Sequence, residues 1–185
     1  MTMPAMTKTD LLLLGLLLDR PMHGYELYQQ IQAEGIDCWF NVSTAGVYYS
    51  LRKLHDQDLV TESRQRAAGS TRKSIYRLTD KGRAVFFEGM DAELANRDEI
   101  YLEFDLAIYL LNKYPLTRAL THLENRQAYL EQEVREVQAA VAAERDNGSS
   151  PLKLAILDHK YRYLEMERRW LAEVVQSIQQ NGEAS

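Results

Sequence analysis

The feature that most constrains the fold of this chain is a change in hydrophobic periodicity at Asp58. Three segments with helical spacing precede it, at about residues 7–19, 24–35 and 43–57. Strand-like alternation follows it over residues 59–65 and 73–78, with a turn at 67–71 between them. Thr79 then begins a fourth helix as its N-cap. The order of helix, helix, helix, hairpin and helix predicts a winged helix, a variant of the helix-turn-helix.

The third of these helices has two different faces. Ser43 is its predicted N-cap. At about 100° per residue, one face is apolar and carries Val47, Leu51 and Leu54. The opposite face carries Ala45, Tyr48, Tyr49 and Arg52. Solvation alone explains two exposed tyrosines poorly, so this face indicates a binding surface.

The charge of the chain is unevenly distributed. The net charge is −5, but residues 1–90 carry +1 and residues 91–185 carry −6. Within the first half, residues 52–83 hold nine basic and four acidic side chains. A local basic surface attracts a polyanion whatever the average over the chain. A merely solvated basic surface explains the charge equally well, so the charge supports nucleic-acid binding only in combination with the winged helix.

The composition argues against several function classes. The single cysteine, Cys38, excludes an internal disulfide, and the four scattered histidines lack metal-ligand spacing. The longest apolar run has eight residues, at 11–18, whereas a membrane helix needs about 20. The sequence has no recognisable nucleophile–base arrangement, carboxylate pair or phosphate-binding glycine loop. We therefore expect a cytoplasmic, non-enzymatic protein without metal, cofactor or membrane partner, in which Cys38 is buried.

Long helices are predicted for the second half of the chain. Residues 99–114 are apolar nearly all round, which indicates one helix buried between other helices or in a partner chain. Residues 117–145 form the next, with a heptad seam at positions 116, 120, 123, 127, 130, 134, 137 and 141. Ser150 is the N-cap of a last helix with two apolar stripes. One stripe comprises Leu152, Ile156, His159, Tyr163, Met166 and Trp170, and the other Leu157, Tyr161, Leu164, Leu171, Val175 and Ile178.

Two apolar faces on one helix require two sets of neighbours, and a second copy of the chain is the simplest source of the second set. We therefore predict a mainly α protein with a small β-hairpin. Residues 1–90 are a winged helix-turn-helix DNA-binding domain, and residues 91–185 are an α-helical dimerisation domain. A self-contained helical bundle is the alternative for the second half. His159 is expected in the core or at the interface.

Four stretches of the first half resemble the PadR family of bacterial transcriptional regulators. They lie at residues 11–18 (LLLLGLLL), 22–27 (MHGYEL), 46–54 (GVYYSLRKL) and 76–83 (YRLTDKGR). The resemblance places Tyr48 in the recognition helix and makes residues 60–78 the basic wing. It departs at Asp58, where the family usually has glycine, and at Thr44-Ala45, where it often has proline-glycine. Asp tolerates the left-handed conformation, so the turn at Asp58 is expected to survive.

The winged helix and the resemblance together predict the site residues. Those expected to approach the DNA groove are Ser43, Thr44, Tyr48, Tyr49 and Arg52. Those expected to bind phosphate are Lys53, Arg64, Arg66, Arg72 and Lys73. The resemblance also implies a small effector, of the aromatic or multidrug-like kind to which PadR relatives often respond. Its candidate pocket comprises Tyr101, Phe104, Tyr109, Tyr161, Tyr163 and Trp170, for which ordinary core packing is the alternative.

The sequence thus predicts a homodimeric, sequence-specific transcriptional regulator, with repression as the expected mode. Its partners are double-stranded operator DNA with an inverted repeat, a second copy of itself, and a small effector that releases it. The alternative is a winged-helix module that binds protein instead of DNA. The basic wing argues against that alternative, because a protein interface needs no such charge.

Overall fold

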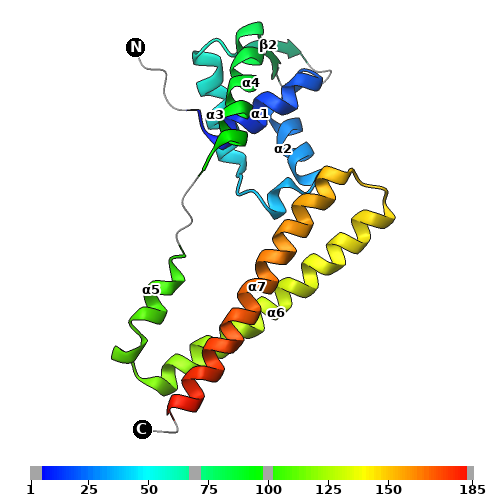
Figure 1. Cartoon of the computed structure of the whole chain (residues 1–185). Helices are drawn as coiled ribbons and strands as arrows, with labels where there is room; N and C mark the ends of the chain where they lie inside the picture. Colours follow the sequence, from blue (N-terminus) through cyan, green and yellow to red (C-terminus); the bar gives the residue numbers. More distant parts are fainter. Residues whose placement is uncertain (1–5, 67–71, 98–101, 183–185) are drawn as a thin grey trace. The chain divides into compact units, whose positions relative to one another are not determined.

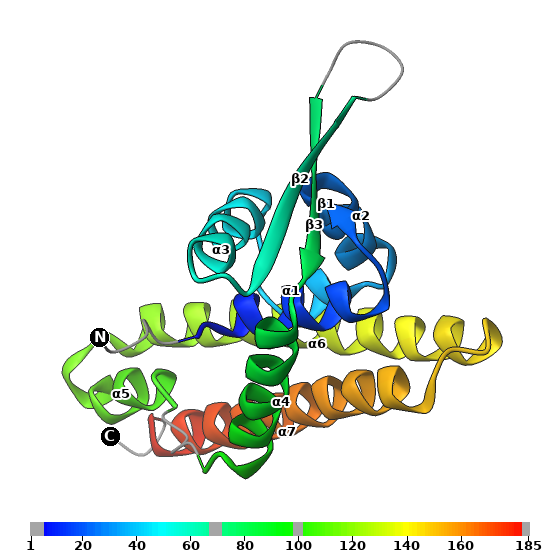
Figure 2. The same cartoon turned by 90° about the horizontal axis from the view of Figure 1, so that it is seen from above.

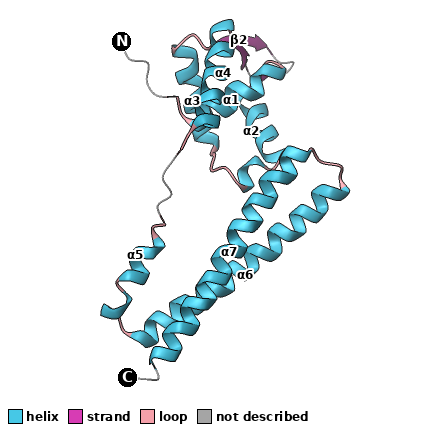
Figure 3. Cartoon of the chain, in the orientation of Figure 1, coloured by secondary structure: helices cyan, strands magenta, loops and turns pink. Residues whose placement is uncertain are grey.

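The computed structural model describes residues 6–66, 72–97 and 102–182, and gives only the backbone for residues 65, 66, 72, 73, 181 and 182. The chain divides into two compact units, Met1–Asp98 and Glu99–Ser185. Helices dominate both units, and the strands lie in the first (Figures 1 and 3). Within the described ranges, no helix has the length and apolar character needed to cross a membrane.

The first unit has the predicted order of helices and hairpin. Its elements are α1 (Lys8–Asp19), β1 (Met22–His23), α2 (Gly24–Ala33), η1 (Ile36–Cys38), α3 (Thr44–Asp56), β2 (Val60–Arg66), β3 (Arg72–Leu78) and α4 (Asp80–Ala95). β2 and β3 pair antiparallel, with Val60 opposite Leu78 and Arg66 opposite Arg72. This arrangement confirms the winged-helix fold.

The sheet has one strand more than the hairpin that the sequence predicts. Its order is β1-β3-β2, and β1 places Met22 opposite Tyr76 and His23 opposite Ile75. A strand of two residues is too short to produce an alternating pattern, so periodicity alone misses it. β1 fixes the segment between α1 and α2 against the wing.

Local side-chain hydrogen bonds set where the helices of this unit begin. The Thr7 hydroxyl accepts a hydrogen bond from the backbone amide of Asp10. The Asp10 carboxylate in turn accepts one from the backbone amide of Thr7, and the two bonds form a capping box. Ser43 and Thr79 cap α3 and α4 through the amides of Gly46 and Gly82, as predicted. Asp58 has a φ of 59°, which confirms that it adopts the left-handed turn after α3.

The core of the first unit forms where α1 packs against α3. Leu13, Leu14 and Leu17 of α1 are buried, as are the predicted inner positions of α3. Those inner positions are Val47, Leu51 and Leu54, each at most 1% exposed. The opposite side of α3, which carries Ala45, Tyr48, Tyr49 and Arg52, is exposed.

A buried ion pair connects the same two helices. Nζ of Lys53 lies 2.6 Å from Oδ2 of Asp10, and Asp10 is 1% exposed. Burial raises the pKa of the Asp10 carboxyl, but hydrogen bonds from Lys53, Thr7 and Ser50 outweigh burial and leave the pKa below its ordinary value of 3.8. This contribution to stability is therefore present above pH 3.8 and is lost as the pH falls through the lowered pKa.

The second unit is built on two long helices. Its elements are α5 (Phe104–Tyr109), η2 (Leu111–Lys113), α6 (Leu116–Asp146) and α7 (Pro151–Gly182). α6 and α7 lie side by side as a helical hairpin (Figure 1). The heptad seam of α6 buries Leu123, Leu130, Val134 and Val137, and α7 buries Leu164, Leu171 and Val175 against it. One predicted stripe of α7 is thus the intramolecular one.

The segment before α6 differs from the prediction of one buried helix over residues 99–114. In its described part, α5 has only six residues and a 3₁₀ turn follows it. Phe104, Ile108 and Leu111 pack against α6 and α7, but Leu106 is 64% and Tyr109 81% exposed. When a segment is apolar on all sides, its sequence does not reveal that only one side of the helix packs against other residues of the chain.

The prediction that Cys38 is buried is also wrong. Cys38 is exposed at the end of η1, where Ile36 alone of the three residues is buried. A 3₁₀ turn offers one inward position, and the apolar Ile36 side chain occupies it.

We predict that Lys53→Met lowers the free energy of unfolding by about 3 kcal/mol, because it leaves the Asp10 carboxylate buried without its cation. Urea denaturation followed by circular dichroism measures the change. Lys8→Met is the matched control, since Lys8 pairs with Glu93 at the surface, and its change should stay below about 1 kcal/mol. Equal losses in the two variants would contradict this role of Lys53.

Candidate nucleic-acid interface

The outer face of α3 presents the residues predicted to meet a binding partner. Tyr48 is 44% and Tyr49 70% exposed, and Arg52 and Thr44 are exposed as well. Ser43 is also exposed, although its hydroxyl oxygen accepts the amide of Gly46 at 3.1 Å. A hydroxyl oxygen has a second lone pair and a rotatable hydrogen, so this cap leaves Ser43 able to make one further contact.

Tyr48 is held in place by a glycine of α2. A Cβ at Gly24 would lie 2.6 Å from Cε1 of the Tyr48 ring, closer than any ordinary contact. The absence of a side chain at Gly24 therefore allows the ring to lie directly on the α2 backbone. Sequence reasoning gave Gly24 no role at the site. Its signal was the stretch MHGYEL, one of the four on which the resemblance to the PadR family rests.

Tyr76 of β3 links the outer face of α3 to the wing. Burial raises the pKa of its hydroxyl above the ordinary value of 10, and the nearby Glu62 and Tyr48 add to the effect, while Arg52 and Arg64 oppose it. The Ser74 hydroxyl donates a hydrogen bond to Glu62, which lowers the pKa of that carboxyl. Sequence reasoning missed Tyr76 and Glu62, because neither position stands out from the alternation of its strand.

The wing carries basic residues along both of its strands. Figure 2 shows the β2–β3 hairpin extending away from the helices of its unit, with α2 and α3 beside its base. The side chain of Arg64 is 70% exposed, and its Nε lies 3.7 Å from Oε1 of Glu62. Arg66 pairs with Arg72 and Gln65 with Lys73 in the backbone register. Three basic residues therefore stand at the far end of the hairpin, while the predicted turn at 67–71 lies outside the described residues.

The prediction that Lys53 binds phosphate does not fit this geometry. Its ammonium group is only 15% exposed and pairs with Asp10 on α1. Lys53 lies on the α3 side that packs inward, next to Leu54. A basic residue near a predicted interface is indistinguishable in sequence from one that neutralises a buried carboxylate.

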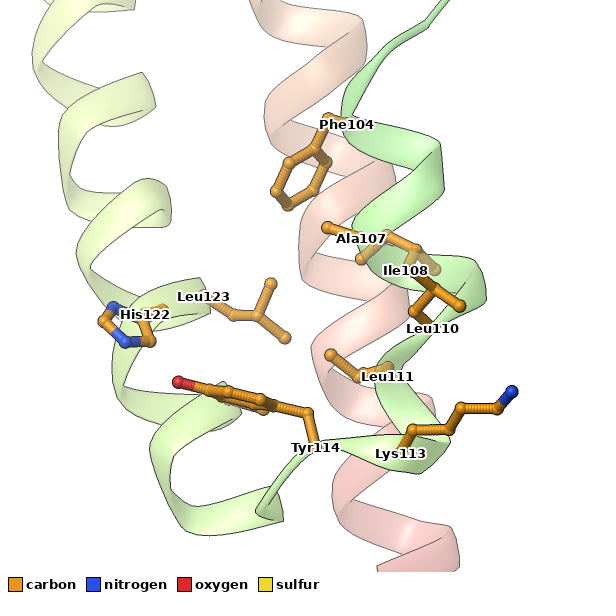
Figure 4. Close-up of a pocket in the computed structure, with 10 residues that line it drawn as sticks. Phe104, Ala107, Ile108, Leu110, Leu111, Lys113, Tyr114, His122 and Leu123 are labelled. Carbon is orange, nitrogen blue, oxygen red and sulfur yellow. The ribbon is translucent and has the colours of Figure 1, made fainter.

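The aromatic residues predicted to line an effector pocket do not share one cavity. Tyr101 lies outside the described residues, and Tyr109 and Tyr163 are 81% and 49% exposed. Phe104 packs edge-on against Trp170, with ring centroids 6.1 Å apart, and it also lines a cavity between α5 and α6 (Figure 4). Tyr161 and Trp170 lie along a separate groove on α7.

His159, predicted in the core or at the interface, is exposed in the single chain and so does not lie in its core, while its place at an interface stays a prediction. Among the described residues, no group of three or more His, Cys, Asp or Glu side chains could hold a metal ion.

In this protein, α3 has an enclosed inner face and an exposed outer face, and the β2–β3 hairpin adjoins it. This arrangement is that of a winged helix-turn-helix protein. Residues 13–88 match the model of the transcriptional regulator PadR-like family. No curated protein matches the chain in sequence.

Solved structures share this fold at low sequence identity. Bacillus subtilis PadR in complex with operator DNA is 19% identical, with a TM-score of 0.74, and the similarity covers 91% of this chain and 98% of PadR. The Vibrio cholerae virulence activator AphA is also 19% identical, with a TM-score of 0.75 and coverage of 93% and 98%. Bacillus subtilis PadR in complex with p-coumaric acid gives 19% identity, a TM-score of 0.70 and coverage of 95% and 99%.

We predict that Gly24→Ala lowers the free energy of unfolding by about 1–3 kcal/mol, because the new methyl group displaces the Tyr48 ring. The double variant Gly24→Ala/Tyr48→Ala should lose little more than Tyr48→Ala alone, since the clash disappears with the ring. Urea denaturation of the three variants measures the coupling. Simple additivity would show that the two residues do not contact each other.

Proposed function

We propose that this protein is a homodimeric, sequence-specific DNA-binding transcriptional regulator that acts as a repressor. The observation that carries the proposal is the outer face of α3, with two exposed tyrosines and an arginine beside a basic hairpin. An α-helix fits the major groove, and a wing reaches the adjacent sugar-phosphate backbone. The PadR-like family consists of transcriptional regulators, which supports a non-enzymatic role.

In this proposal the site residues have two kinds of task. Thr44, Tyr48, Tyr49 and Arg52 meet the groove, together with the Ser43 hydroxyl. Arg52 favours guanine, because a guanidinium binds O6 and N7 of that base together. Arg64, Arg66, Arg72 and Lys73 bind phosphates and set the register of the protein on the duplex. Lys53 is left out, because it is committed to Asp10.

Dimerisation is supported by the second apolar stripe of α7. Its intramolecular stripe is buried, but Leu152 is 79%, Tyr163 49% and Met166 51% exposed. Leu106 and Tyr109 of α5 are exposed as well, so a lone chain leaves considerable apolar area of the second unit in water. A second copy covers it with the same surface, as a two-fold axis requires.

A two-fold dimer determines what DNA it can read. Two copies of α3 related by the axis face two half-sites in inverted orientation, whose centres lie about 34–36 Å apart or a multiple of that distance. Each half-site adds to the affinity, because the second contact is intramolecular. A dimer bound over a promoter excludes polymerase, which is the physical basis of repression.

A small molecule is proposed to release the dimer from DNA. Bacillus subtilis PadR has been solved both with operator DNA and with p-coumaric acid, which supports DNA and a small effector as partners of a chain with this fold. The dimer would have conformations that differ in the distance between its two copies of α3. An effector can release the DNA only if it binds more tightly to a conformation that does not fit the operator.

The experiment that tests this function is sequencing of the DNA that the purified full-length protein selects from random duplexes at physiological salt. An enriched inverted repeat is the expected result. Transcription in vitro from a promoter containing that repeat should fall when the protein is added. Absence of any enriched sequence at low and physiological salt would overturn the proposal in favour of a protein-binding winged helix.

We predict that Arg72→Ala combined with Lys73→Ala weakens binding to the selected DNA. The slope of log K against log salt concentration should fall by about two units, because each lost phosphate contact removes about one. Fluorescence anisotropy over a salt series measures both quantities. Arg135→Ala combined with Arg145→Ala removes the same charge from exposed sites on α6 and should change neither the affinity at fixed salt nor the slope appreciably.

We also predict that Met166→Glu converts the dimer to a monomer, because the interface would bury two uncompensated carboxylates. Size-exclusion chromatography with light scattering measures the mass, and circular dichroism confirms that helix content is retained. The variant should bind a single half-site and lose the benefit of the second. Ala172→Glu, at an exposed position of the same helix, should remain dimeric. A monomeric wild type would contradict the assignment.

A further inference from the structure

The second unit contains a cavity that neither the aromatic set predicted from sequence nor the DNA-binding surface explains. It has a volume of about 420 Å³ and lies between α5, η2 and α6 (Figure 4). Sites for small molecules commonly span about 300–1,000 Å³. All of its lining residues belong to one unit, so the cavity does not depend on how the two units are arranged.

Most of the cavity wall is apolar. Phe104, Ile108 and Leu111 come from one side and face Leu123 of α6 (Figure 4). The same side of α5 packs toward α6, whereas Leu106 and Tyr109 are on its exposed side. The cavity is therefore separate from the apolar surface assigned above to the dimer.

One end of the cavity is polar. Tyr114 directs its hydroxyl toward the imidazole of His122 on α6, while the ammonium group of Lys113 points away from the cavity (Figure 4). In the part of the chain that the structure describes, neither the Tyr114 hydroxyl nor His122 has a hydrogen-bond partner. Both groups can therefore donate a hydrogen bond to a molecule in the cavity.

The charge at this end favours an anion. Arg118 lies over the Tyr114 ring, with its Cζ 5.4 Å from the ring centroid, and it shares a face of α6 with His122 at a spacing of four residues. None of the described residues that line the cavity is acidic. The first turn of α6 also has no acidic residue and no side-chain cap, so its positive end is uncompensated there.

We propose that this cavity binds a small amphipathic anion, with an apolar body between α5 and α6 and a carboxylate-like group held by Tyr114, His122 and Arg118. The apolar body packs on Phe104, Ile108, Leu111 and Leu123. The role of this molecule as the effector rests on the proposed function. Its binding to the cavity does not, because binding requires no DNA. An effector in this site would contact both α5 and α6. Its binding could therefore change how these two helices pack within the second unit.

The probe for this site is 2-naphthoate, and its neutral isostere 2-naphthamide is the control ligand. Isothermal titration of the full-length protein should show saturable binding of naphthoate, one per chain, with the amide at least about tenfold weaker. Absence of saturable binding, or equal affinity for the two compounds, would overturn the proposal.

Two pairs of variants locate the bound probe. Ala107→Trp fills the cavity and should weaken naphthoate binding by at least about tenfold, whereas Ala128→Trp, at an exposed α6 position outside it, should not. Tyr114→Phe removes one donor and should weaken naphthoate more than naphthamide, whereas Tyr129→Phe should change neither. Unchanged binding in Ala107→Trp, or an equal loss in Ala128→Trp, would overturn the site.

The same protein samples separate this proposal from DNA binding. Light scattering and anisotropy with the selected DNA should show that Ala107→Trp is still dimeric and still binds DNA. Failure of naphthoate binding with intact DNA binding overturns the cavity site alone. Failure of DNA binding in the wild type overturns the proposed function and leaves the ligand measurement valid.

Discussion

The packing of α1 against the inner face of α3 is the contact on which the rest of the first unit depends. Val47, Leu51 and Leu54 are buried on this face, and Asp10 and Lys53 form a charged pair between the same two helices. A misplaced register would leave that carboxylate buried without its cation, which is costly. The packing thereby determines which side of α3 meets solvent, and so where Tyr48, Tyr49 and Arg52 are presented.

The exposed face of α3 also depends on contacts from other elements. Gly24 of α2 supports the Tyr48 ring, and Tyr76 of β3 lies close to Tyr48, Arg52 and Glu62. β1 joins these parts, because it pairs His23, the neighbour of Gly24, with Ile75, the neighbour of Tyr76. The helix α3 and the wing are therefore held together as one surface. This suits the proposed DNA binding, in which α3 contacts the major groove while the wing contacts the DNA phosphates.

The second unit shows the opposite situation, in which apolar surface exceeds what one chain can cover. The α6–α7 pair buries one stripe of α7 and leaves Leu152, Tyr163 and Met166 of the other exposed, and α5 covers only part of its own apolar surface. A surface of this kind is expected to be completed by another molecule. The side of α5 proposed for the dimer differs from the side that lines the cavity, so the proposed ligand and the proposed assembly would be coupled through one short helix.

Much of this protein is determined by local pattern in the sequence. The faces of α3, the caps at Ser43 and Thr79, the left-handed turn at Asp58 and the heptad seam of α6 all follow from spacing and residue type, because each depends on neighbours within a few positions. Only the tertiary structure decided the roles of Lys53, Gly24 and Tyr76, the strand β1, the exposure of Cys38 and the break in α5. Each of these depends on a partner distant in the chain, or on the lack of one, and periodicity contains no information about such partners.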